Sequence, residues 1–141
     1  MPTINFAIEN QQELLWCWAA VSISVDKSLP PRESTFAQCN LAEAVLPGAQ
    51  GCCGAPRPAA CKNEATLRDG LTAVDRAPGP VTGPLSFNNI KRELKAPRRM
   101  PVCIVIAWES DPDILHFAVI SRCRVRNKVK MVRVEDPDGP A

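Results

Sequence analysis

The chain has 141 residues and a formal net charge of +2 at pH 7, from 17 basic and 15 acidic side chains. This length suits one domain with its own core, and a charge so close to neutral argues against a nucleic-acid-binding protein. No apolar run approaches the roughly 18 residues of a membrane-spanning helix, and the N-terminus lacks the pattern of a secretory signal. We therefore expect a single monomeric domain, 1–141, with no nucleic-acid partner and no membrane span.

Basic residues are concentrated in one part of the sequence. Eleven of the seventeen Lys and Arg lie between Lys91 and Arg133, against four acidic residues in the same span. Such a bias is typical of the solvated face of amphipathic strands, and a surface that steers charged ligands is the alternative.

Two patterns give different starts for the first helix. Apolar residues over 14–29 predict a buried helix, and the capping-box spacing of Asn10 and Glu13 would start that helix at Gln11. On one continuous helix, however, Gln11 and Cys17 point to different faces. A joint catalytic role for these two residues requires a short turn over Leu14 and Leu15, packed into the core, and a new helix that begins near Cys17.

The remaining pattern changes from helical to extended along the chain. Before the first helix, 2–10 reads as a short strand or an extended lead-in. Further helices are predicted at 34–46, 64–74 and 87–94, and strands at 102–108, 117–125 and 129–134, with a tight turn at 126–128. Helices followed by antiparallel strands predict an α+β fold, with a helical half over about 1–96 and a β half over about 97–141.

Cys17 lies between two tryptophans at the predicted entrance of an apolar helix. A thiol attacks a carbonyl as its thiolate, so it needs a nearby base and a positive environment, which a helix N-terminus provides. The chain has one histidine, His116. If Cys17 is a nucleophile, His116 is the one imidazole that can serve as its base.

The third member of such a site would be a residue that orients the imidazole. Asp136 ends the last predicted strand, and antiparallel neighbours can place it beside His116 at the start of the preceding strand. Asp138 is the alternative. Taken singly, a buried Cys, a lone His and an Asp-Pro turn are usually structural, so the prediction depends on their combination.

That combination resembles papain-like cysteine peptidases, and most closely the small bacterial forms that include the AvrRpt2 effector proteases. The resemblance is carried by Gln11, by 16–20 (Trp-Cys-Trp-Ala-Ala), by 116–120 (His-Phe-Ala-Val-Ile) and by 136–137 (Asp-Pro). It implies a papain-like fold that uses no cofactor and no metal. The family often has glycines before its histidine, whereas this chain has Ile-Leu at 114–115, which implies a stiffer loop or a narrower substrate groove.

The resemblance also assigns a role to each residue of the site. Cys17 would be the nucleophile, His116 the base and then the acid, and Asp136 the group that orients the imidazole. Gln11 and the Cys17 backbone N–H would form the oxyanion hole. Trp18 would pack beneath the site.

Seven cysteines are many for a reducing compartment unless they bind metal. Adjacent Cys52 and Cys53 cannot both ligate one zinc ion without strain, so disulfides with Cys39 and Cys61 are favoured over a zinc site. We predict the pairs Cys39–Cys52 and Cys53–Cys61. Two more cysteines, at 103 and 123, would form either a third bridge or a pair of buried free thiols.

The leading functional hypothesis is a thiol peptidase that acts on peptides or proteins and is secreted or delivered outside the producing cell. An inhibitor or immunity protein would then be a second kind of partner. One alternative keeps the same three residues and performs deamidation or transglutaminase-like acyl transfer. Another is a non-enzymatic, disulfide-stapled binding module in which Cys17 belongs to the core.

Overall fold

The computed structural model describes residues 2–31, 35–79 and 83–139. Its elements, in chain order, are helices α1 (Cys17–Ser28), α2 (Gln38–Val45), the 3-10 helix η1 (Ala59–Cys61), α3 (Leu67–Ala73) and α4 (Phe87–Leu94), followed by strands β1 (Val102–Trp108), β2 (Asp111–Arg126) and β3 (Val129–Glu135). The three strands form one antiparallel sheet with β2 in the centre. The predicted α+β class is therefore confirmed.

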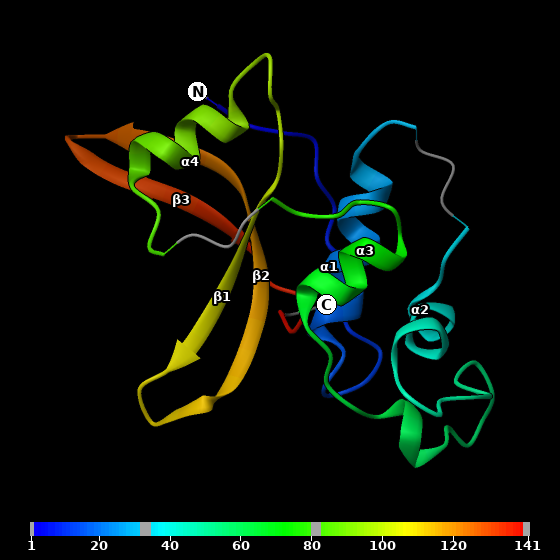
Figure 1. Ribbon diagram of the computed structural model, residues 1–141. Coiled ribbons are helices and arrows are strands. Elements are labelled where there is room, and N and C mark those ends of the chain that lie inside the picture. Colours follow the sequence, from blue (N-terminus) through cyan, green and yellow to red (C-terminus); the bar gives the residue numbers. More distant parts are fainter. Residues whose placement is uncertain (1, 32–34, 80–82, 140–141) are drawn as a thin grey trace.

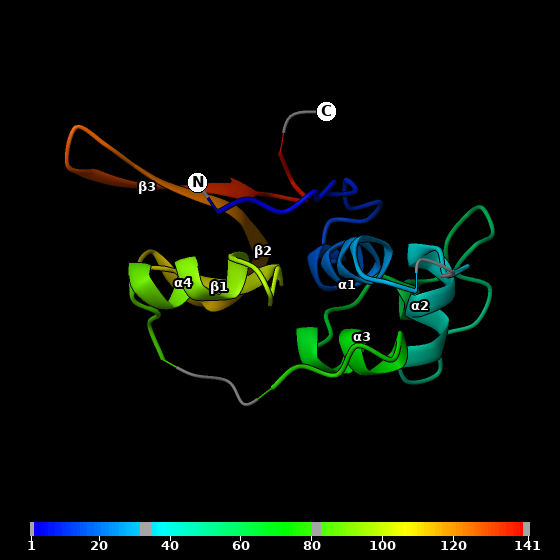
Figure 2. The ribbon, with the colours of Figure 1, turned by 90° about the horizontal axis from the view of Figure 1, so that it is seen from above.

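The helices divide into two groups around the sheet (Figure 1). Helices α1, α2 and α3 pack on one another, and α4 packs on the sheet. Helix α1 also contacts β2, so it joins the helical group to the sheet, as the view from above shows (Figure 2). In the described part of the chain, no helix is long and apolar enough to cross a membrane.

Helix α1 begins at Cys17, as the catalytic interpretation requires, and the alternative start at Gln11 is wrong. The side-chain amide of Gln11 donates to the carbonyls of Glu13 at 3.1 Å and Leu14 at 2.6 Å. These two hydrogen bonds stabilise a non-helical turn before α1. Leu14 is 83% exposed, so the expectation that this turn packs Leu14 into the core is wrong. The apolar pattern that marks the core therefore begins after the turn.

Close packing of α1 against α3 depends on a small residue. A Cβ atom added to Gly70 on α3 would lie 3.1 Å from the ring of Trp18 on α1 and closer still to Ser22. Such contacts are shorter than real Cβ atoms tolerate without movement of a neighbour, so only glycine lets the two helices approach this closely.

The other predicted elements agree to different degrees. Helix α4 and strand β1 have the predicted bounds, whereas α2 and α3 begin later than predicted, and position 34 of the predicted second helix lies outside the described residues. Strand β2 begins at Asp111 and not at 117, because its pairing with β1 continues to the end of the hairpin. Asn127 and Lys128 both have positive φ, which is the backbone of the predicted tight turn.

The two faces of the sheet contribute to different cores. Ile104 and Ile120 pack with α4, and Val119 packs with α1 and α3. The lead-in over 2–10 is extended, as predicted, and Thr3 forms a β-bridge with Arg122. This arrangement leaves β2 as the strand that links both cores.

The disulfides use the predicted four cysteines in a different pairing. Cys39 bonds to Cys53, and Cys52 bonds to Cys61, so the predicted connectivity is wrong. Cys52 and Cys61 are both fully buried beneath α2, whereas Cys53 is exposed. Neighbouring side chains at 52 and 53 point in different directions, and burial decides which of them reaches Cys61.

Cys103 and Cys123 are free thiols. The register places Cys103 opposite Val119 and Cys123 opposite Val132. The two thiols also belong to cores on opposite faces of the sheet. Of the two alternatives that the sequence left open, the pair of free thiols is the one observed.

Candidate active site

Cys17 is the first residue of α1 and is 7% exposed. Trp16 precedes it with non-helical backbone angles and gives no side-chain cap to the helix. The first backbone N–H groups of a helix have no partner within the helix, and here those of Cys17 and Trp18 lie near enough to the thiol to lower its pKa. Trp18 is fully buried in the helical core directly after Cys17.

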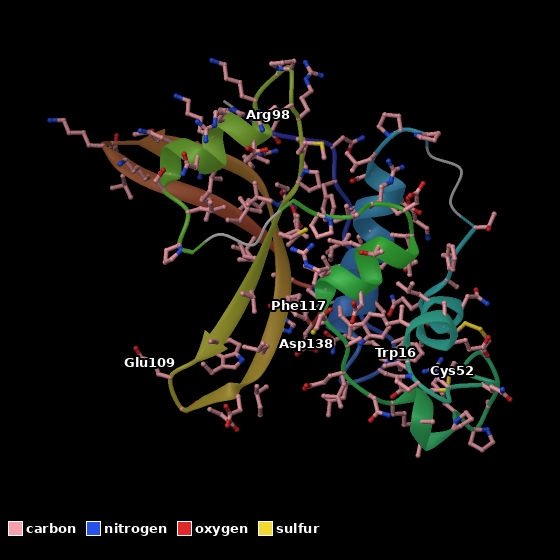
Figure 3. The ribbon with its side chains drawn as sticks, viewed as in Figure 1. Trp16, Cys52, Arg98, Glu109, Phe117 and Asp138 are labelled. Carbon is pink, nitrogen blue, oxygen red and sulfur yellow. A yellow bond between two sulfur atoms is a disulfide. The ribbon has the colours of Figure 1, made fainter. Side chains whose placement is uncertain are left out.

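The thiol also faces the sheet. The backbone N–H of Phe117, on β2, lies near enough to the Cys17 sulfur to lower the pKa of the thiol. Phe117 lies where β2 meets the helical group (Figure 3), and its side chain packs against the helical core and against the core between α1, α3 and β2. Strand β3 pairs with β2 only as far back as Val119. The edge of β2 at Phe117 is therefore not covered by β3, and α1 can approach it.

Burial raises the pKa of the Cys17 thiol above its usual value, and the nearby Glu64 carboxylate raises it further. The hydrogen bonds from the three backbone N–H groups lower this pKa, as expected at a helix N-terminus, but burial outweighs them. The thiol is therefore protonated at neutral pH. A catalytic role for Cys17 thus requires a base that removes its proton during the reaction.

The imidazole of His116 forms the second part of the site. Its Nε2 lies 2.6 Å from Oδ1 of Asp136, and its side chain is 14% exposed. Burial alone would raise the pKa of Asp136, but the hydrogen bond from His116, the backbone N–H of Asp138 and the charge of His116 outweigh this and lower the pKa. Asp136 is therefore ionised at neutral pH beside His116.

The arrangement of strands brings these two residues together. His116 is on β2, and Asp136 follows the last residue of β3. Asp138, the alternative partner, directs its backbone N–H to Asp136 at 2.9 Å and does not contact His116 through its side chain. The backbone N–H of Gln11 donates to the carbonyl of Pro137 at 2.8 Å, which ties the segment before α1 to the segment after β3.

The thiol of Cys17, on α1, lies beside the β2 residue that follows His116, and it is not joined directly to the imidazole. The thiol contacts the backbone of Phe117, the next residue after His116, and no hydrogen bond links the thiol to the imidazole in the described residues. Catalytic hydrogen bonds in unliganded enzymes are often long and tighten when substrate binds.

Gln11 lies outside α1, and its amide nitrogen is occupied by the turn at Glu13 and Leu14. Both acceptors are carbonyls, so the nitrogen is the amide atom that must face them. Its Oε1 is buried with no hydrogen-bond partner in the described residues. The predicted oxyanion role of Gln11 therefore requires the amide to release one of these carbonyls, and it stays a prediction.

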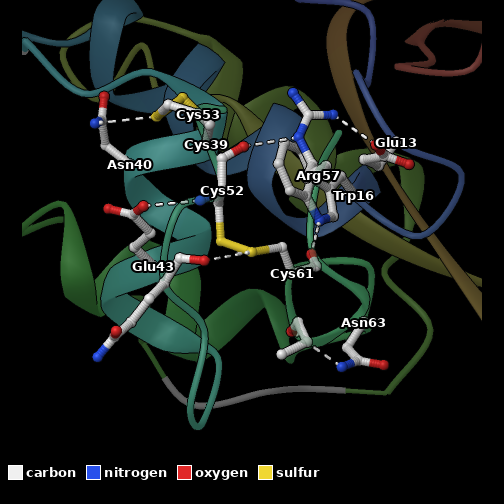
Figure 4. Close-up of a disulfide and its surroundings, with 12 residues drawn as sticks. Glu13, Trp16, Cys39, Asn40, Glu43, Cys52, Cys53, Arg57, Cys61 and Asn63 are labelled. Atoms are coloured by element: carbon white, nitrogen blue, oxygen red, sulfur yellow. Dashed lines mark hydrogen bonds and ion pairs between the residues drawn. A yellow bond between two sulfur atoms is a disulfide. The ribbon is translucent and has the colours of Figure 1, made fainter. Parts of the chain in front are cut away.

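The loop that carries the Cys52–Cys61 disulfide supports the residues just before the nucleophile (Figure 4). The indole Nε1 of Trp16 donates to the carbonyl of Cys61 at 2.7 Å. The guanidinium of Arg57 lies 4.5 Å from the centroid of the Trp16 ring, pairs with Glu13 at 2.6 Å and donates to the carbonyl of Cys52 at 2.7 Å. Arg57 could not be predicted from the sequence, because nothing in its local pattern distinguishes it from any other loop residue.

A second tryptophan contact places an acidic residue close to the thiol. The indole Nε1 of Trp18 donates to the carbonyl of Asn63 at 3.3 Å, and the next residue is the exposed Glu64. The carboxylate of Glu64 lies near enough to Cys17 to raise the pKa of its thiol. Glu64 is the first residue of the predicted helix 64–74, but the structure places it before α3.

Compared with known proteins, the chain matches no protein-family model, no curated protein and no solved structure. The geometry of Cys17, His116 and Asp136 is therefore the basis on which its function is inferred.

Proposed function

We propose that the chain is a papain-like thiol peptidase that cleaves amide bonds of peptides or proteins. Cys17 is the nucleophile, His116 transfers the proton and Asp136 orients the imidazole. The observation that carries the proposal is the 2.6 Å contact between His116 and Asp136. The thiol at the start of α1 lies near the backbone N–H of Phe117, the residue after His116. A cysteine that only fills space in a core has no use for a nearby imidazole paired with an ionised carboxylate. It also has no use for backbone N–H groups close to its sulfur.

The tautomer of His116 follows from its contact with Asp136. Nε2 donates to the carboxylate, so Nδ1 is the ring nitrogen that accepts the proton of the thiol. As the proton moves to Nδ1, the sulfur bonds to the carbonyl carbon and the carbonyl oxygen takes the negative charge. The C–N bond then breaks, and the imidazolium returns its proton to the departing amine.

The negative oxygen needs hydrogen-bond donors. The backbone N–H of Cys17 is at the first turn of α1, where the helix leaves it without an internal partner. Gln11 supplies the second donor once its amide turns from the carbonyl of Glu13, the longer of its two hydrogen bonds. Water then hydrolyses the thioester, with His116 as the base.

Two disulfides in the described residues support an oxidising location outside the producing cell. A peptidase delivered there meets protein substrates, and an inhibitor or immunity protein would protect the producer. The half-exposed side chains of Ile114 and Leu115 precede His116 and are available to contact a substrate.

Activity against fluorescently labelled casein, kept under non-reducing conditions, tests the proposal. Cys17→Ala and His116→Ala should each lower turnover by about a thousandfold or more, and Asp136→Asn by up to about ten-thousandfold, because the three residues act as a unit. Cys123→Ala is the matched control, since it removes a buried free thiol far along β2 and should retain activity.

Mass spectrometry of the products distinguishes hydrolysis from acyl transfer, because only hydrolysis shortens the casein chain. Near-normal turnover in Cys17→Ala or His116→Ala would show that the site is assigned wrongly. If the wild type neither cuts casein nor reacts with iodoacetamide at Cys17 faster than at Cys123, the non-enzymatic alternative is correct.

A further inference from the structure

A hollow of about 670 Å³ lies between α4 and the second half of β2, away from the candidate active site. None of its lining residues belongs to the Cys17, His116 and Asp136 site. We call it the α4 groove, and its lining includes Phe87, Leu94 and Val125 together with four basic residues. The peptidase proposal makes no use of this surface.

The basic residues of the α4 groove lack acidic partners. Lys91, Lys95, Arg99 and Arg124 line it, no acidic residue does, and none of the four forms an ion pair within the described part of the chain. Four like charges around one hollow repel one another, and an anionic ligand would relieve that repulsion.

Arg99 lines this surface and has an unusual backbone conformation. Its φ is 46°, in the left-handed region that non-glycine residues adopt at a cost in free energy. The backbone N–H of Arg99 donates to the carbonyl of Lys95, and that of Met100 donates to the carbonyl of Glu93, which closes the end of α4. A glycine would make this turn without strain, so the presence of an arginine points to a use for its side chain.

The α4 groove is also partly apolar. Val125 is 56% exposed within it, and Leu94 and Phe87 form its base with the buried Cys123. The amine of Lys130 lies 5.7 Å from the centroid of the Phe87 ring and so occupies one face of that ring. The groove therefore offers cations together with apolar surface, and Phe87 is the one aromatic side chain among its lining residues.

We propose that the α4 groove binds an acidic polypeptide segment of a partner protein, with an apolar side chain between its carboxylates. The carboxylates would pair with Lys91, Lys95, Arg99 and Arg124, and the apolar side chain would cover Val125. A long nucleic acid fits less well, because the span 91–133 carries a formal charge of +7 and the remainder of the chain carries −5. The concave shape also favours an inserted peptide segment over a flat lipid surface.

Fluorescence anisotropy of labelled probes on the full chain tests this proposal. The main probe is a short peptide of repeated Glu-Leu-Glu units. It should bind, and its affinity should fall as the salt concentration rises from about 50 to about 300 mM. The comparison probes are the same peptide with Gln in place of Glu, an oligothymidylate, and phosphatidylcholine vesicles that contain phosphatidylserine. None of these should bind as tightly as the acidic peptide.

Charge-reversal variants locate the binding. The double variant Lys91→Glu with Arg99→Glu should lower the affinity for the acidic peptide by about tenfold or more. The matched control, Lys62→Glu with Arg68→Glu, makes the same charge change on the exposed helical side and should shift affinity by less than about twofold. Val125→Thr keeps the strand and the charges. It should lower the affinity for the peptide and leave the salt dependence of that affinity unchanged.

Several results would overturn the proposal. These are equal loss of affinity in both double variants, tighter binding of the oligothymidylate or the vesicles, and no binding of the acidic peptide to a folded wild type. Because the probes report on the α4 groove and not on Cys17, these results do not depend on whether the chain is a peptidase.

Discussion

Replacing Arg57 with methionine should lower the free energy of unfolding by about 3 kcal/mol. The ion pair with Glu13 contributes up to about 1 kcal/mol, because both side chains are only 21% exposed. The contact with the Trp16 ring adds about 0.5–1 kcal/mol. The hydrogen bond from the charged guanidinium to the carbonyl of Cys52 adds about 1.5 kcal/mol.

Methionine fills a similar volume on the Trp16 ring, so the loss comes from the polar contacts of Arg57. The measurement is urea unfolding under non-reducing conditions, with Arg68→Met as the matched control, since Arg68 is exposed and makes one hydrogen bond to the carbonyl of Gly79. The control should change stability by about 0.5 kcal/mol or less. Arg57→Lys should fall between the two, because an ammonium keeps the charge but lacks the planar fork.

The same substitution should slow alkylation of Cys17 by iodoacetamide at a pH and urea concentration where both proteins remain folded. Arg57 holds Trp16 and Glu13, and these residues set the backbone that leads into the first turn of α1. If Arg57→Met destabilises the chain no more than Arg68→Met and leaves the alkylation rate unchanged, the disulfide loop does not support the nucleophile.

Two further predictions concern the thiols. Glu64→Gln removes a charge that raises the pKa of Cys17, so the pH midpoint of Cys17 alkylation should move down. The control is Asp69→Gln, which removes an acidic residue on α3 and should leave the midpoint in place. An upward shift of the midpoint in Glu64→Gln, or no shift, would contradict the proximity of Glu64 to Cys17. Burial raises the pKa of Cys103 to about 11, so Cys103 should resist alkylation in the native protein at pH 8 and react after unfolding. Because this pKa is higher in the folded state, the related stabilisation is complete below about pH 9 and is lost as the pH rises through about 11. Mass spectrometry of labelled peptides and unfolding measurements against pH, with Cys103→Ala as reference, check both statements, and rapid labelling of native Cys103 at pH 8 would contradict them.

Much of the local structure follows from short-range patterns in the sequence. Helix α4 has a serine N-cap and an apolar face, and β1 is a run of β-favouring residues, so both are recognisable without tertiary information. The start of α1 could be predicted only by giving the chemistry of Cys17 more weight than the capping-box pattern at Asn10 and Glu13. The same reasoning selected His116 and Asp136, because one histidine and one strand-ending Asp-Pro leave few choices.

Long-range packing decided the features that the sequence left open or predicted wrongly. Adjacent Cys52 and Cys53 have no local property that selects their partners, and the pairing follows from which side chain is buried beneath α2. Leu14 is apolar yet exposed, because the turn made by Gln11 directs it away from the core. Arg57 approaches Trp16 across about forty residues of chain, and the α4 groove brings α4 together with β2. Contacts of this kind depend on where distant segments meet, and that is set by the folded core and not by local propensity.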